Sequence, residues 1–188
     1  QEIKGMTVNL ADGDAKGTAS SADQGNDELY GIENVLGSNF TADTIYANSS
    51  TNVITTQAGN DYVEARDGAD TVLAGAGNDT IVATSASDGI DRYDGSSDVD
   101  TLDYSALGSS NAITVDLSVA ATHDFDGAGG NDSWQVSVNG GDNDIIKDIE
   151  NIIGGAGNDT IIANAAANEI QGGAGADLLS GNVGNDTI

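Results

Sequence analysis

The sequence contains no cysteine and no proline, and it has one histidine among 188 residues. Without cysteine the chain can form neither a disulfide framework nor a thiolate metal site, and one histidine cannot build a histidine-based zinc centre. Basic residues are also scarce, with 5 lysines and arginines against 31 acidic residues and a formal net charge of -26. Nucleic acids and anionic membranes bind clustered basic side chains, so neither is expected as a partner. Apolar runs are too short for membrane insertion.

The acidic residues are mostly of one kind, because 25 of them are aspartate and 6 are glutamate. A surface that only needed charge for solubility could use either residue. Aspartate is favoured where a short carboxylate must lie in a tight turn or bind a hard cation. Glycine is abundant as well, with 26 residues, which indicates many tight turns.

A nine-residue unit recurs along the chain. The segment GGAGNDTII at 154–162 returns as GGAGADLLS at 172–180. Units in the same frame begin at Ser38, Ala47, Thr56, Ala65, Ala74, Ala86, Gly95, Gly154, Ala163, Gly172 and Gly181, with three extra residues at 83–85. The sixth residue is aspartate in nine of these eleven units and asparagine in two, and the eighth is aliphatic or tyrosine in all. A pattern kept in frame this often indicates a solenoid.

Each unit combines a glycine-rich turn with a very short strand that carries one large apolar side chain. One unit cannot bury that side chain alone, whereas stacked coils of two units bury it against their neighbours. The sequence therefore predicts an all-β roll in which alternate units lie on the same edge. The sixth residues that this arrangement stacks are Asp43/Asp61, Asp61/Asp79, Asp79/Asp100, Asp70/Asp91, Asp159/Asp177 and Asn168/Asp186.

Carboxylates stacked at the spacing of one coil repel each other by about 1 to 3 kcal/mol per pair, so a cation is expected between them. Carboxylates and the carbonyls of glycine-rich turns make an all-oxygen site, which suits Ca²⁺. The stacked pairs predict about six calcium ions, with two further positions where Asp27 and Asp144 lead into the arrays. The candidate metal residues are Asp43, Asp61, Asp70, Asp79, Asp91, Asp100, Asp159, Asp177, Asp186, Gly59, Gly68, Gly75, Gly77, Gly155, Gly157, Gly173 and Gly175.

The units at Gly154 and Gly172 match the pattern G-G-x-G-x-D-x-U-x, where U is a large apolar residue, at every fixed position. The sequence resembles the hemolysin-type calcium-binding repeats of RTX (repeats-in-toxin) proteins over 38–82, 86–103 and 154–188. The resemblance implies a right-handed parallel β-roll with Ca²⁺ between successive turns, held by aspartate side chains and turn carbonyls. It also implies type I secretion from a Gram-negative cell and folding in external calcium.

Two further pairs of segments indicate a tandem duplication. Residues 6–10 (MTVNL) resemble residues 113–117 (ITVDL), and residues 31–35 (GIENV) resemble residues 148–152 (DIENI). A repeat array follows each set. We therefore expect two units, each with a strand-rich cap and a roll, over residues 1–103 and 104–188.

These features favour a non-enzymatic, calcium-binding structural module of a large secreted or cell-surface protein of the S-layer or adhesin type. The alternative is an accessory calcium- or polysaccharide-binding module of a secreted enzyme such as an epimerase, lyase or protease. His123, Asp124 and Asp126 could form an acid–base cluster, but no nucleophile motif accompanies them, so a solvated loop is expected. Beyond calcium, the expected partners are other copies of the chain or cell-surface polysaccharide.

Overall fold

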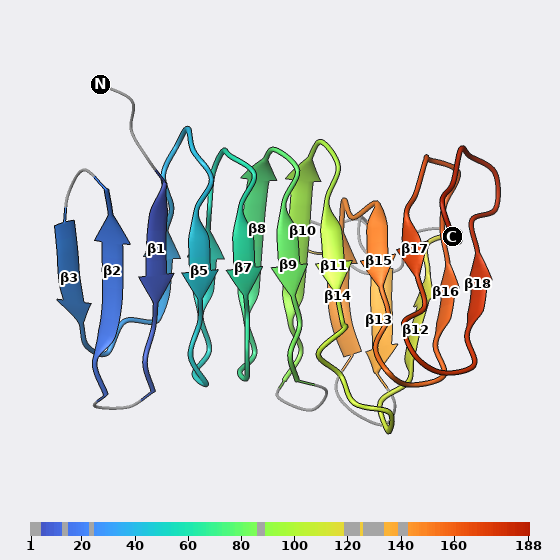
Figure 1. The fold of residues 1–188 in the computed structure, drawn as a ribbon, viewed down its shortest axis with the longest axis horizontal. Coiled ribbons are helices and arrows are strands. Elements are labelled where there is room, and N and C mark those ends of the chain that lie inside the picture. Colours follow the sequence, from blue (N-terminus) through green and yellow to red (C-terminus); the bar gives the residue numbers. More distant parts are fainter. Residues whose placement is uncertain are drawn as a thin grey trace.

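The computed structural model describes residues 5–12, 15–22, 25–85, 89–118, 125, 134–138 and 143–188. Within these residues all regular structure is short β-strand, and the strands form two nine-stranded sheets that lie one in front of the other (Figure 1). No helix in the described part of the chain is long and apolar enough to cross a membrane. The predicted all-β parallel roll is confirmed.

The first sheet contains, in spatial order, β3 (Gly25–Leu29), β2 (Gly17–Ser21), β1 (Met6–Asn9), β5 (Thr44–Tyr46), β7 (Tyr62–Glu64), β9 (Thr80–Val82), β11 (Thr101–Asp103), β15 (Asn151–Ile153) and β17 (Ile170–Gln171). The second sheet contains β4 (Asn34–Leu36), β6 (Val53–Thr55), β8 (Thr71–Ala76), β10 (Arg92–Ser97), β14 (Asn143–Lys147), β13 (Trp134–Val138), β12 (Ile113–Asp116), β16 (Thr160–Ile162) and β18 (Leu178–Ser180). Successive units alternate between the sheets, so each coil contributes one strand to each.

The apolar eighth residues of the units line the space between the sheets. In the first sheet parallel pairing aligns Ile45, Val63, Ile81 and Leu102 in one row. Nine of the eleven eighth residues are buried, Tyr93 among them. Leu179 is half-buried and Ile188 is 67% exposed, and both lie in the last coil that the structure describes. The core is therefore a one-dimensional stack that each coil extends.

Each predicted cap is a three-stranded antiparallel segment at the start of a repeat array. Strands β1, β2 and β3 belong to the first sheet, and strands β12, β13 and β14 belong to the second. Both caps continue into an array by parallel pairing, β1 with β5 and β12 with β16. The two caps therefore occupy opposite sheets of the roll.

Both sheets run without interruption across residue 103. Strand β10 pairs in parallel with β14, and β11 pairs in parallel with β15. The two arrays and their caps consequently form one continuous roll. The division of the sequence into a duplicated pair, 1–103 and 104–188, stays a prediction about its origin.

Strand β6 offers a matched test of the core, because Ile54 is fully buried and its neighbour Val53 is 44% exposed. Ile54→Ala should lower the free energy of unfolding by about 2 to 5 kcal/mol, because it leaves a cavity between tightly packed coils. Val53→Ala should change it by less than about 1 kcal/mol. Urea unfolding in millimolar calcium measures both values, and equal losses would contradict the packing described here.

Candidate metal sites

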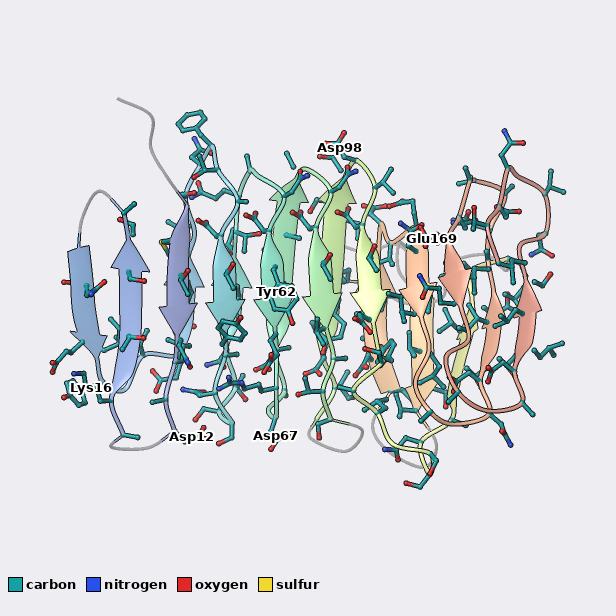
Figure 2. The ribbon with its side chains drawn as sticks, viewed as in Figure 1. Asp12, Lys16, Tyr62, Asp67, Asp98 and Glu169 are labelled. Carbon is teal, nitrogen blue, oxygen red and sulfur yellow. The ribbon has the colours of Figure 1, made fainter. Side chains whose placement is uncertain are left out.

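The turns between strands form two long edges of the roll. The turns that lead into β5, β7, β9 and β11 make the first edge, and those that lead into β6, β8 and β10 make the second. Figure 2 marks the two edges with Asp98 and Asp67, which project from turns on opposite sides of the sheets. The sixth residue of each unit lies at the base of its turn, directly before the strand.

The sixth residues form a ladder of hydrogen bonds along each edge. On the first edge the backbone N–H of Asp43 donates to Oδ1 of Asp61, and Asp61 donates likewise to Asp79, both at 2.7 Å. Asp79 then donates to Oδ1 of Asp100 at 2.8 Å. On the second edge Asp70 donates to Asp91 at 2.7 Å. Each carboxylate is therefore fixed to the preceding coil by one of its oxygens.

All six pairs that the sequence frame stacks are adjacent in the structure. The two remaining pairs are joined in the same way, Asp159 to Asp177 at 2.9 Å and Asn168 to Asp186 at 3.0 Å. The extra residues 83–85 do not disturb the ladder, because the pairs that span them keep the same short contacts. Seven of the predicted metal aspartates are buried, and only Asp177 and Asp186, in the last coil, are half-buried.

The second carboxylate oxygen is the atom available to a metal ion. Among the described residues, Oδ2 of Asp61, Asp79 and Asp100 is buried and accepts no hydrogen bond. These three residues follow one another on the first edge. A buried carboxylate oxygen without a partner costs free energy, so three in a row fit a site for a hard cation.

Burial raises the pKa values of these carboxyl groups. The pKa of Asp79 rises to about 6 and that of Asp100 to about 7, although the backbone hydrogen bond each accepts lowers it. Burial also raises the pKa of Asp61. Neighbouring carboxylates add to the shift, since Asp61 raises the pKa of Asp79 and Asp79 raises that of Asp100. Without a cation, keeping the buried carboxylates of the first edge ionised therefore costs free energy.

The turns of successive coils pack backbone against backbone, and glycine makes this close approach possible. Gly77 and Gly175 have φ angles of +125° and +131°, and a Cβ at either position would overlap the carbonyl oxygen of the glycine one coil earlier. Among the other predicted metal glycines, Gly59, Gly68, Gly75 and Gly173 also have positive φ. Gly155 and Gly157 instead lie against Leu107 and Asn111 of the loop before β12.

The second edge satisfies two of its carboxylates without an ion. The buried hydroxyl of Tyr93 donates to Oδ2 of Asp91 at 2.6 Å, and Tyr104 donates to Oδ2 of Asp144 at 2.9 Å. The predicted position of Asp144 next to the array is correct, because its Oδ1 accepts from the backbone N–H of Asp91 at 3.3 Å. Asp27 lies instead on the exposed strand β3 and joins no ladder contact.

Sequence reasoning missed one member of the first edge. The backbone N–H of Asp100 donates to Oε2 of Glu150 at 2.9 Å, so a glutamate continues the aspartate ladder. Burial raises the pKa of Glu150 as well. A signal was present, because residues 145–153 fit the frame directly before Gly154, with Glu150 sixth and Ile152 eighth.

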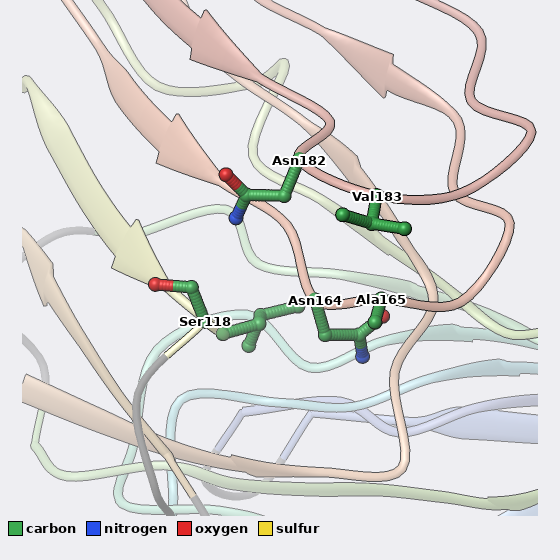
Figure 3. Close-up of a pocket in the computed structure, with 6 residues that line it drawn as sticks. Ser118, Asn164, Ala165, Asn182 and Val183 are labelled. Atoms are coloured by element: carbon green, nitrogen blue, oxygen red, sulfur yellow. The ribbon is translucent and has the colours of Figure 1, made fainter.

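Other arrangements of the described residues do not compete with these edges. No three histidine, aspartate or glutamate side chains in the described ranges are grouped to hold a metal ion by themselves, so turn carbonyls would have to complete each site. His123, Asp124 and Asp126 lie outside the described residues. A pocket in Figure 3 carries no titratable side chain and is lined by Leu117, Ser118, Asn164, Ala165, Asn182 and Val183.

Comparison with protein families identifies the repeats. The family model of the RTX calcium-binding nonapeptide repeat matches residues 39–72, 46–81 and 152–188. No curated protein matches the chain. The matched residues include the turns of Asp61 and Asp79 and those of Asp159, Asp177 and Asp186. Over these two blocks the chain matches the RTX calcium-binding nonapeptide repeat, and these repeats indicate a calcium-binding module.

Proposed function

We propose that the chain is a structural module that folds on binding calcium outside the cell, as part of a large secreted or cell-surface protein of the S-layer or adhesin type. The observation that carries this proposal is the row of unpartnered, buried Oδ2 atoms on Asp61, Asp79 and Asp100. A calcium ion supplies positive charge and accepts several oxygen ligands at once. Calcium ions would lie between neighbouring carboxylates of this row, Asp61 with Asp79 and Asp79 with Asp100, and the stacked turn carbonyls would complete each site.

Calcium binding would be coupled to folding, because the carboxylates converge only when the coils stack. With free calcium at ten times its dissociation constant, each independent site adds about 1.4 kcal/mol to stability. About six sites would then contribute roughly 8 kcal/mol, which is comparable to the whole stability of an ordinary domain. Six divalent ions would also remove nearly half of the net charge of -26.

The affinity expected for such sites fits a switch that works outside the cell. Calcium sites of extracellular modules have dissociation constants of about 10⁻⁴ to 10⁻³ M. A module with such sites stays unfolded at cytosolic calcium concentrations and folds after export. Secretion through a type I system fits this order of events, since an unfolded chain is the form that is exported and a folded one is the form that acts.

Circular dichroism with a calcium titration tests the proposal directly. The calcium-free chain should lack most of its β signal, and millimolar calcium should restore it with a rise in melting temperature. Magnesium at the same concentration should have a much smaller effect, because Mg²⁺ keeps its water ligands more tightly. A β signal and melting temperature that chelation leaves unchanged would overturn the proposal.

Asp79 tests the stacking, because it has a carboxylate neighbour on both sides, whereas the exposed Asp67 is a control in a turn of the opposite edge. Asp79→Asn should raise the calcium concentration at the midpoint of folding by about threefold or more, since ligand charge sets affinity in such sites. Calorimetry should show fewer bound ions. Asp67→Asn should leave both quantities unchanged, and equal behaviour of the two variants would show that the assignment is wrong.

The raised pKa values predict how stability depends on pH without calcium. Asp79 and Asp100 have pKa values of about 6 and about 7 in the fold, against 3.8 as the ordinary value. Folding therefore favours the protonated forms of Asp79 and Asp100. Their contribution to the stability of the fold is complete below about pH 4 and is lost as the pH rises through 6 to 7. Folding of the calcium-free chain should therefore be less unfavourable at pH 5 than at pH 8, so the chain should keep more of its β signal at pH 5.

The β signal in circular dichroism, recorded in buffers freed of calcium by resin, measures this dependence. Asp79→Asn serves as the control, because removing one of the two groups should flatten the profile between pH 5 and 8. With calcium present the trend should reverse, since protons displace the ion from the same oxygens. A calcium-free β signal that rises from pH 5 to pH 8 would contradict the burial described for these carboxyl groups.

A further inference from the structure

The first edge of the roll continues across the interruption between the two arrays. The last sixth-position aspartate of the first array is Asp100, and Glu150 and then Asn168 follow it in the next two coils. The backbone N–H of Asp100 donates to Oε2 of Glu150 at 2.9 Å, and Nδ2 of Asn168 donates to the carbonyl oxygen of Glu150 at 2.7 Å. Asp100 and Glu150 both lie outside the residues that the RTX repeat model matches.

The two turns that meet at this junction differ in length. Parallel pairing of β10 with β14 and of β11 with β15 leaves six residues, 95–100, opposite three residues, 148–150. The side chain of glutamate is one methylene longer than that of aspartate. From the shorter turn, the carboxylate of Glu150 therefore still reaches the N–H of Asp100, as an aspartate does in the regular coils.

Buried oxygens without a hydrogen-bond partner lie in the coils on both sides of Glu150. In the described part of the chain, these are Oδ2 of Asp100 and Oδ1 of Asn168. Asp100 is 1% exposed and Asn168 is 3% exposed. A buried oxygen that accepts no hydrogen bond costs free energy, and Ca²⁺ takes oxygen ligands of this kind. The row of unpartnered oxygens that begins at Asp61 therefore continues past Glu150 into the second array.

A backbone carbonyl oxygen approaches the same aspartate carboxylate. A Cβ at Gly95 would overlap both Oδ2 of Asp100 and the carbonyl oxygen of Asp148 in the next coil. In the second array, Gly154 has the same relation to Oδ2 of Asp159 and to a carbonyl oxygen of the next coil, each 2.5 Å from the position of a Cβ. The junction thus brings a carboxylate and a turn carbonyl together as a matched repeat does, although its second turn contains no glycine.

The negative charge of the junction is not neutralised by a basic side chain. Among the described residues, no lysine or arginine forms an ion pair with Asp100 or Glu150. The ammonium group of Lys147 lies 3.4 Å from Asp94 and 4.0 Å from Asp148 instead. Burial raises the pKa of Asp100, and the carboxylate of Glu150 adds to the shift. A cation between the two carboxylates would relieve this repulsion.

We propose that the junction binds a further divalent cation between the carboxylates of Asp100 and Glu150, with the carbonyl oxygen of Asp148 as another ligand. Oxygen ligands alone favour Ca²⁺, and in the identity of the ion this inference rests on the function proposed above. Asp100 and Glu150 are 50 residues apart in the sequence, so their carboxylates meet only when the second cap packs on the first array. The ion therefore links the folding of the two arrays across the break in the repeats.

The number of bound calcium ions is the first test. Glu150→Gln removes one negative charge but keeps an oxygen that can accept the N–H of Asp100. Equilibrium dialysis at saturating calcium, followed by elemental analysis, should give about one ion fewer per chain than in the unaltered protein. Glu169→Gln is the matched control, because Glu169 has an exposed side chain in the next coil and should leave the count unchanged (Figure 2).

The single tryptophan allows a test of the link between the arrays. Trp134 belongs to β13 of the second cap, so its fluorescence should report the folding of that cap, whereas circular dichroism follows the strands of both arrays. In the unaltered protein, the two signals should change at the same calcium concentration. Glu150→Gln should raise the fluorescence midpoint about threefold or more and separate it from the circular dichroism signal. Glu169→Gln should leave the two midpoints together.

Glu150→Lys is a complementary variant, because its ammonium group would take the place of the cation beside Asp100. This variant should fold in calcium with about one ion fewer per chain and without the rise in the fluorescence midpoint. Failure to fold, or a full ion count, would exclude a cation between the two side chains.

The outcomes separate this inference from the function proposed above. An unaltered chain that binds no calcium would contradict both. A chain that binds calcium and folds with it, but keeps the same ion count and the same fluorescence midpoint after Glu150→Gln, would contradict the junction site alone.

Discussion

The contact on which the roll depends is the hydrogen bond from the backbone N–H of one sixth-position residue to the carboxylate of the next. It recurs on both edges at 2.7 to 2.8 Å across the first array, and it fixes one coil against another where the chain turns. The same contact buries a row of aspartate carboxylates inside the protein. Stacking and charge burial are thus two results of one interaction, and a cation would make them compatible along the first edge while the carboxylates stay ionised.

Much of this arrangement could be predicted from the sequence, because the frame of nine residues carries two independent signals. The apolar eighth residue identifies the core, and the aspartate at the sixth position identifies the stacked pairs, so Asp61 and Asp79 could be placed together without a structure. The role of the backbone could not be predicted in this way. The frame shows carboxylates that repel, whereas the structure shows that each of them also accepts a main-chain hydrogen bond.

The parts that escaped prediction are those where the frame is interrupted. Glu150 lies in a unit without a glycine-rich turn, so its place in the ladder is evident only from the pairing of β15 with β11. The tyrosine hydroxyls of Tyr93 and Tyr104 reach carboxylates of the second edge through the core, which a pattern of residue types does not describe. The continuity of the roll across residue 103 depends on β13, whose antiparallel course between β12 and β14 restores the register after a long break.

The placement of the caps in opposite sheets has a geometric consequence. The first cap extends the first sheet and the second cap extends the second, so equivalent strands of the two halves look out from opposite sides of the molecule (Figure 1). Moving an equivalent cap from one sheet to the other corresponds to a half-turn about the long axis, combined with a translation along it. The two caps are thus placed as along a screw axis, and any feature that both display is presented to two sides of the surroundings in alternation.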